Sequence, residues 1–192
     1  MSCPIEKLYN DFENLKIYLL KSKELDYFNL VEKQFTKNLI ISSASFIESF
    51  LQKILINFVD KTSSHDIITH FLKNKAISRQ YHTYFNWDSK NANNFLGLFG
   101  NDFKEHMKDK IKSNNMESNI KSFLELGKLR NELVHQNFII YTTDKTLEEI
   151  KNLFIEAKTF VMFFEEEINK YKNHLQIQYQ QKSLNSSYGI KI

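Results

Sequence analysis

Apolar residues recur at intervals of three and four along most of the chain, the spacing that puts them on one face of an α-helix. One such stripe covers residues 5–20, and a longer one covers residues 27–59. Extra apolar residues broaden the longer stripe, so we expect that helix to be buried on much of its circumference at the centre of a bundle. The pattern returns over residues 116–135 and most strongly over residues 146–174. It predicts an all-α fold made of long helices.

The segment between these stripes is less regular. Residues 60–115 favour short helices near 66–74 and 103–111, separated by the stretch FNWDSKNANNFLGLFG, where Asn, Asp and Gly cluster. After residue 175 the sequence is polar and has no clear stripe, so we expect it to fray or to dock on a partner. We therefore predict one helical domain, residues 1–175, followed by a polar C-terminal tail, residues 176–192.

The start of the last long helix carries a capping signal. Thr146, followed three residues later by Glu149, fits a capping box, in which each side chain accepts a hydrogen bond from the other residue's free backbone N–H group. Thr143 is a competing cap. The sequence leaves the choice between the two threonines open.

The composition agrees with a helical protein. The chain of 192 residues contains four glycines and one proline, and these are the residues that tight turns and sheets need most. Its 42% hydrophobic content is enough for one domain with a sizeable buried core. We expect one domain rather than two.

Charge, cysteine use and hydropathy narrow the function classes. A formal net charge of +3 gives only mild attraction for polyanions, so any contact with nucleic acid would be local. Cys3 is the single cysteine, which excludes an intrachain disulfide and agrees with a reducing compartment. The first residues, MSCPIEKLYNDFENL, do not have the apolar run of a signal peptide. The most apolar region, residues 38–59, is interrupted by Glu48 and Lys53, which argues against a membrane span. We predict a cytoplasmic protein without a membrane partner.

The stretch GKLRNELVHQNF, residues 127–138, contains an unusual choice of residue. Among the 26 basic residues, only Arg79 and Arg130 are arginines. A guanidinium is planar and permanently charged, and it can hold two oxygens of a phosphate or carboxylate at once. An arginine here therefore favours two-pronged binding of an anion. The plainer alternative is an exposed arginine and a helix-terminal histidine on a solvated face.

On a helical wheel this stretch has two distinct sides. Arg130, Asn131 and His135 lie away from the core stripe, and Asn131 and His135 are four residues apart and can touch. Val134 lies between them, and a contact with a second helix on this face would explain an apolar residue there. The core stripe consists of three leucines, Leu126, Leu129 and Leu133.

Other candidate groups are weaker. Glu48 either lies on a narrow polar edge of its helix or reaches Arg130 and orients it. His65 and His70 are five residues apart, whereas metal ligands on one helix prefer three or four, so no metal site is predicted. An aromatic and basic segment either stacks nucleic-acid bases or packs in the core, with packing favoured. This segment consists of Arg79, Tyr81, His82, Tyr84, Phe85, Trp87 and Lys90.

The string LRNELVHQNF resembles the R-x4-6-H signature of the HEPN superfamily (higher eukaryotes and prokaryotes nucleotide-binding), including the polar residue directly after the arginine. The order of ASFIESFLQKIL, NANNFLGLFGNDF and a helix ending in LRNELVH is similar to the RiboL-PSP branch and related phage-defence families. The resemblance covers roughly residues 25–170. It implies an up-and-down helical bundle that commonly dimerises. In many members it implies a metal-independent endoribonuclease of toxin–antitoxin or antiviral systems.

The resemblance also implies roles for individual residues. Cleaving RNA without a metal drives the 2′-hydroxyl onto the neighbouring phosphate, which needs a base, an acid and a cation. His135 would be the acid or base, Arg130 the cation, and Asn131 would orient His135 or bind a phosphate oxygen. One chain supplies one such histidine, so we expect a homodimer, with Val134 in its interface, to complete the site. The expected partners are an RNA substrate, the second copy, and an antitoxin or defence-system protein; no cofactor is expected.

Two alternatives stay open at this point. The chain is either a non-catalytic HEPN module, in which the same helix mediates dimerisation or binds a nucleotide or a partner protein, or a plain helical scaffold in which the spacing of the arginine and the histidine is accidental. A measurement of RNA cleavage would distinguish the enzyme from both of these alternatives.

Overall fold

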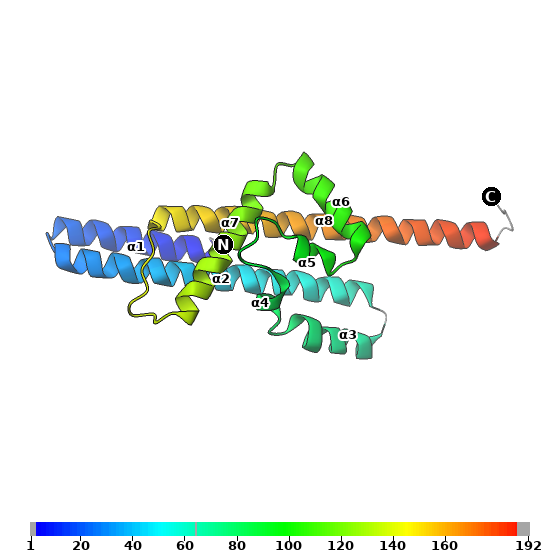
Figure 1. Cartoon of the computed structure of the whole chain (residues 1–192), viewed down its shortest axis with the longest axis horizontal. Coiled ribbons are helices and arrows are strands. Elements are labelled where there is room, and N and C mark those ends of the chain that lie inside the picture. The colour runs from blue at the N-terminus through cyan, green and yellow to red at the C-terminus, as the bar shows by residue number, and fades with distance from the viewer. Residues whose placement is uncertain (1–2, 64, 188–192) are drawn as a thin grey trace.

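Two long helices, α2 (Leu25–Thr62) and α8 (Leu147–Ser187), lie side by side along the long axis of the molecule (Figure 1). The computed structural model describes residues 3–63 and 65–187, with side chains up to residue 177. Helix α1 (Pro4–Lys21) folds back along the first half of α2, and α7 (Glu117–His135) crosses both α2 and α8 obliquely. Within these described ranges the chain has helices and no strand, which confirms the all-α prediction.

Helix α2 is the centre of the bundle, as its broad apolar stripe predicts. It contacts α1, α7 and α8, and its buried side chains include Leu39, Ile40, Ile47 and Leu51. By length and composition α2 is also apolar enough to cross a membrane, and it is the one such helix among the described residues. In its most apolar stretch 44% of the residues are buried inside the protein, and a core helix meets the same criterion.

Helix α8 begins with the capping box. The backbone N–H and the hydroxyl of Thr146 donate to the Glu149 carboxylate at 2.7 and 2.8 Å, and the Glu149 N–H donates to the Thr146 hydroxyl at 3.2 Å. Thr146 is therefore the cap, and Thr143 instead accepts a hydrogen bond from the Lys145 N–H.

The C-terminal end of α8 differs from the expectation of a frayed tail. The helix continues through residues 176–187, because no glycine or proline interrupts the sequence between its start and Ser187. Residues 188–192 of the expected tail lie outside the described residues. The division of the chain at residue 175 stays a prediction.

The middle of the chain is more helical than its irregular pattern suggests. It contains α3 (Asp66–Leu72), one π-helical turn η1 (Lys73–Ile77), α4 (Tyr81–Tyr84), α5 (Asn93–Gly97) and α6 (Asn101–Ser113). Only α3 and α6 correspond to the short helices predicted. The positive φ of Gly100, 96°, makes the turn into α6, a backbone conformation that glycine adopts without strain.

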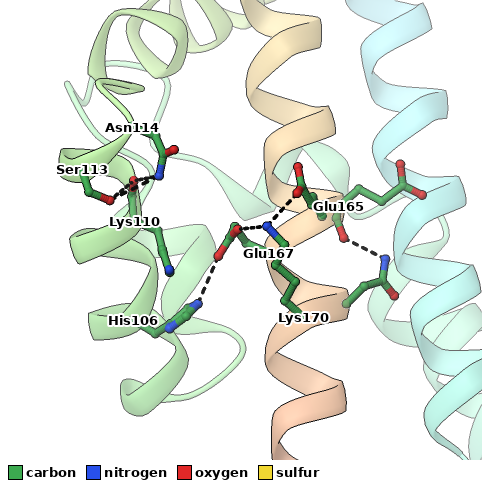
Figure 2. A network of polar contacts seen from close by, with 9 residues as sticks. His106, Lys110, Ser113, Asn114, Glu165, Glu167 and Lys170 are labelled. Carbon is green, nitrogen blue, oxygen red and sulfur yellow. Dashed lines mark hydrogen bonds and ion pairs between the residues drawn. The ribbon is translucent and has the colours of Figure 1, made fainter.

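A polar network joins α6 to α8 (Figure 2). Glu167 is 4% exposed, and its Oε1 atom accepts a hydrogen bond from Lys170 Nζ at 2.9 Å. His106 Nε2 approaches Glu167 Oε2 to 3.3 Å without the alignment of a hydrogen bond, and the Tyr171 ring packs on the imidazole. Together with the packing of Phe103 on Phe164 and Tyr171, this contact joins α6 to α8.

Candidate functional site

Helix α7 carries the arginine and histidine on the side that the wheel predicts. Leu126, Leu129 and Leu133 are all buried against the bundle. Arg130 and Asn131 are half-buried, whereas His135 is exposed at the last residue of the helix. The polar side of α7 is therefore partly covered by other elements and is not a freely solvated face.

Arg130 is held by its neighbour. Its Nη1 atom donates to Asn131 Oδ1 at 3.0 Å, so the amide of Asn131 orients the guanidinium. The contact between Asn131 and His135 that their spacing allows is not formed. Among the described residues His135 has no hydrogen-bond partner.

Glu48 reaches the same region from α2 without pairing with Arg130. Its Oε1 atom accepts a hydrogen bond from Gln52 Nε2 at 3.2 Å, one turn further along α2. No ion pair joins Glu48 to Arg130 in the described part of the chain. Glu48 is half-buried and lines the same cleft as the arginine.

A cleft of about 380 Å³ collects these side chains, which is within the range of small-molecule and nucleotide sites. Helix α2, the segment around α4, and helix α7 all contribute to its walls. Its lining residues are Ala44, Glu48, Tyr81, His82, Trp87, Gly127, Arg130, Asn131, Val134 and His135. Every site residue predicted from the sequence is thus brought to one cleft.

The hydroxyl of Tyr81 is neutral, and the charges of Glu48 and Arg130 both act on it. Burial raises the pKa of Tyr81 far above its ordinary value, the charge of Glu48 raises it further, and the charge of Arg130 lowers it. The Tyr81 hydroxyl therefore stays protonated at neutral pH and lies in the fields of both charged groups. It can donate a hydrogen bond to an anion bound in the cleft.

Some residues of the aromatic and basic segment pack in the core and others line the cleft. Tyr81, Tyr84 and Phe85 are buried, and Phe85 packs on Phe95 and Phe123 with ring centroids 4.6 and 4.7 Å apart, which confirms the prediction of core packing. His82 and Trp87 from the same segment line the cleft.

The position of His82 corrects the number of histidines that the sequence predicted for the site. That interpretation counted one histidine per chain at the site, whereas the cleft is lined by both His82 and His135. The only signal in the sequence is that His82 lies within an aromatic and basic segment. Its distance of 53 positions from His135 hides their proximity, which the fold alone creates.

The loop that follows His135 is tied down by a buried lysine. Lys37 on α2 is 5% exposed, and its Nζ atom donates to the backbone carbonyls of Phe138 and Ile139 at 2.7 and 3.1 Å. These bonds anchor the chain just beyond the end of α7. They therefore also restrict where His135 can lie.

The described residues contain no group of three or more His, Cys, Asp or Glu side chains arranged to hold a metal ion. His65 and His70 are exposed at and within α3, and neither lines the cleft of Arg130.

A model of one protein family, described as RiboL-PSP-HEPN, matches residues 5–170. No curated protein and no solved structure matches the chain. The family match includes α1, α2, the middle helices, all of α7 and the buried part of α8, so it covers the cleft completely. The chain therefore belongs to the RiboL-PSP-HEPN family.

Proposed function

We propose that the protein is a metal-independent endoribonuclease that cuts RNA by attack of a 2′-hydroxyl on the neighbouring phosphate. The observation that carries the proposal is the cleft in which Arg130, Asn131 and His135 meet Glu48 and the Tyr81 hydroxyl. HEPN domains are ribonuclease-type or nucleotide-binding modules, so the family supports the same class of ligand. We place this activity in a cytoplasmic toxin–antitoxin or anti-phage defence system, where a partner protein restrains it.

Each residue has a role that its surroundings support. The guanidinium of Arg130 is permanently charged and pre-oriented by Asn131, which suits it to bind two phosphate oxygens and to stabilise the phosphorane. His135 is exposed, and an imidazole has one nitrogen that can accept a proton and one that can donate it, so this side chain can take part in either proton transfer. Glu48 and Tyr81 add further polar groups to the lining of the same cleft.

A homodimer is part of the proposal. Val134 is 50% exposed beside His135, and Phe138, Ile139 and Ile140 continue the exposed apolar surface along the following loop. Four exposed apolar side chains within seven residues suit a contact between two copies. A two-fold axis at this segment would bring two His135 side chains toward one RNA strand.

The test is cleavage of single-stranded RNA in EDTA by wild type, Arg130→Ala and His135→Ala. Transesterification leaves 2′,3′-cyclic phosphate and 5′-hydroxyl ends, which end-labelling and mass spectrometry identify. We expect wild type to produce these ends and both variants to lose at least about 100-fold in rate. If His135→Ala cut RNA at the wild-type rate, or if the products had other ends, the proposal would be wrong.

The dimensions of the cleft also support a second candidate, a non-catalytic module that binds a nucleotide. A volume of about 380 Å³ accommodates a nucleotide, and its aromatic wall includes Trp87. Wild type would then bind a mononucleotide, with loss of binding in Arg130→Ala, and would leave RNA intact.

A further inference from the structure

Transesterification of RNA moves two protons, and within one chain the proposed site assigns a group to only one of these transfers. The second group comes either from His135 of the second copy or from another residue of the same cleft. We infer that His82, from the same chain, is the second proton-transfer residue. The inference rests on the proposed function and adds a catalytic residue to it. It follows from the cleft itself, in which His82 and His135 are the two lining histidines.

The backbone around His82 is firmly held. Its neighbour Tyr81 is 8% exposed and packs on Trp87 with ring centroids 5.5 Å apart. Tyr84 is 7% exposed, and its hydroxyl donates to the backbone carbonyl of Ala76. The Thr83 N–H donates to the Gln80 carbonyl at 2.8 Å and closes the turn.

With the residues on both sides anchored in this way, His82 is exposed at the edge of the cleft on a fixed turn. Within the described part of the chain the His82 side chain forms no hydrogen bond or ion pair, and such a side chain on a well-supported turn suits a reactive role rather than a packing role.

The other polar groups of the cleft are less suited to the second transfer. Tyr81 has a raised pKa and holds its proton too tightly to release it at neutral pH. The guanidinium of Arg130 is permanently charged and has no lone pair to accept a proton, so it cannot act as an acid and base pair would. Glu48 already accepts a hydrogen bond from Gln52. A histidine can donate in one protonation state and accept in the other near neutral pH, which is the property that a paired acid and base need.

The step balances with two imidazoles. One imidazole, in its neutral form, takes the proton of the 2′-hydroxyl as the 2′-oxygen forms its bond to phosphorus. The other, in its protonated form, gives its proton to the 5′-oxygen as the bond between phosphorus and that oxygen breaks. The products are a 2′,3′-cyclic phosphate and a 5′-hydroxyl, and the two histidines have exchanged protonation states. Arg130 stabilises the charge on the phosphate during the transfer.

This arrangement gives each chain both proton-transfer groups. Dimerisation would then bring together two complete clefts rather than two half-sites. The two arrangements differ in a mixture of inactive variants. Mixing Arg130→Ala with His135→Ala chains restores activity if the copies share residues at one phosphate. Activity stays absent if each cleft works with its own residues, which is the result expected here.

The direct test compares His82→Ala with His70→Ala, an exposed histidine on α3 outside the cleft. Wild type should show a bell-shaped dependence of cleavage rate on pH, as an acid and a base produce. His82→Ala should lose about 100-fold or more in rate and one limb of the bell, and added imidazole should restore part of the rate. His70→Ala should match wild type. Wild-type rate and pH dependence in His82→Ala would overturn the inference while leaving the proposed function intact.

A second measurement separates the two proposals even if no RNA is cut. Uridine 3′-monophosphate is titrated into protein with ¹⁵N-labelled histidines, and the imidazole signals are followed by NMR. The signals of His82 and His135 should move with one dissociation constant, and neither should move in Arg130→Ala. Movement of His135 alone would overturn the role of His82. If both signals move but the protein does not cut RNA, the shared phosphate site is retained. The proposed nuclease activity and the proton transfer assigned to His82 are then both overturned.

Discussion

The indole ring of Trp87 lies directly on Gly127 of α7, where a Cβ atom would stand 2.0 Å from the ring atom Cζ3. The glycine is buried, and the missing side chain is what lets the ring approach the helix. Trp87 lines the cleft of Arg130 on one side and a second cleft of about 470 Å³ on the other. The contact between Trp87 and Gly127 therefore forms the wall between the two clefts.

Replacing Gly127 by alanine should destabilise the protein, although alanine is the better helix former. The gain in helix propensity is about 0.5–1 kcal/mol, whereas overpacking a rigid ring costs about 1–3 kcal/mol. We expect a net loss, with a fall in Tm of about 2–4 °C for each kcal/mol lost in a chain of this size. Trp87 is the single tryptophan, so its fluorescence reports the displacement directly.

Gly97→Ala on α5 is the matched control, because the nearest atom to its new Cβ would be Lys104 Cδ at 3.9 Å. This change should leave Tm unchanged or slightly higher. Gly127→Ala should lower Tm less when it is introduced into the Trp87→Leu variant than when it is introduced into wild type. If the two changes were simply additive, the contact would not be the cause.

Arg130→Lys should be nearly as inactive in RNA cleavage as Arg130→Ala. Lysine keeps the charge but loses the planar, two-pronged geometry that Asn131 orients, so we expect the rate to fall by about 100-fold. Arg79→Lys changes the other arginine, which is exposed outside the cleft, and should cut RNA at the wild-type rate. Full activity in Arg130→Lys would mean that the site needs only a positive charge.

If the proposed dimer forms through α7, Val134→Glu should shift the protein toward monomer. The charge would be buried against the second copy if this segment is the interface, and an unpaired buried charge is strongly unfavourable. Sedimentation velocity measures the change directly. Met162→Glu on α8 is the control, because Met162 is 52% exposed and Val134 50%. Equal loss of dimer in both variants would point to a general effect of charge rather than to an interface at α7.

Glu149→Gln should lower Tm at neutral pH and have little effect in acid. The Thr146 N–H and hydroxyl donate to this carboxylate and hold the pKa of Glu149 below its ordinary value of 4.5. A lowered folded-state pKa means that the charged form stabilises the fold above pH 4.5, and that this stability is lost as the pH falls through the lowered pKa. Thermal unfolding of wild type and variant at a series of pH values from 7 down to 2 follows this loss.

Glu117→Gln, in the first turn of α7, is the control for Glu149→Gln. It removes an exposed carboxylate from a helix start that has no side-chain cap. Its effect on Tm should be smaller at pH 7 than that of Glu149→Gln. A difference between wild type and Glu149→Gln that does not shrink as the pH is lowered stepwise from 7 to 2 would show that the lost charge is not responsible.

Periodicity was enough to predict the four long helices, and a local motif narrowed the cap of the last one to Thr146 or Thr143, because both signals depend on residues within a few positions of each other. The hydrogen bonds of the folded chain identify Thr146 as the cap. The same reasoning identified the polar side of α7, since a helix places Arg130, Asn131 and Val134 by geometry alone. It misjudged residues 176–187, where the absence of an apolar stripe did not end the helix. Short elements such as α4 and α5 carry too few residues to show a period.

The sequence by itself determined the fold class, the long helices and the candidate residues on α7, because each is encoded by spacing along one segment. Only the tertiary structure decided what faces Arg130. Glu48 lies 82 positions before it and His82 lies 48 positions before it, and their meeting in one cleft depends on how α2 and α4 pack against α7. Such proximity arises from burying the apolar stripes of several helices at once, and no single segment records it.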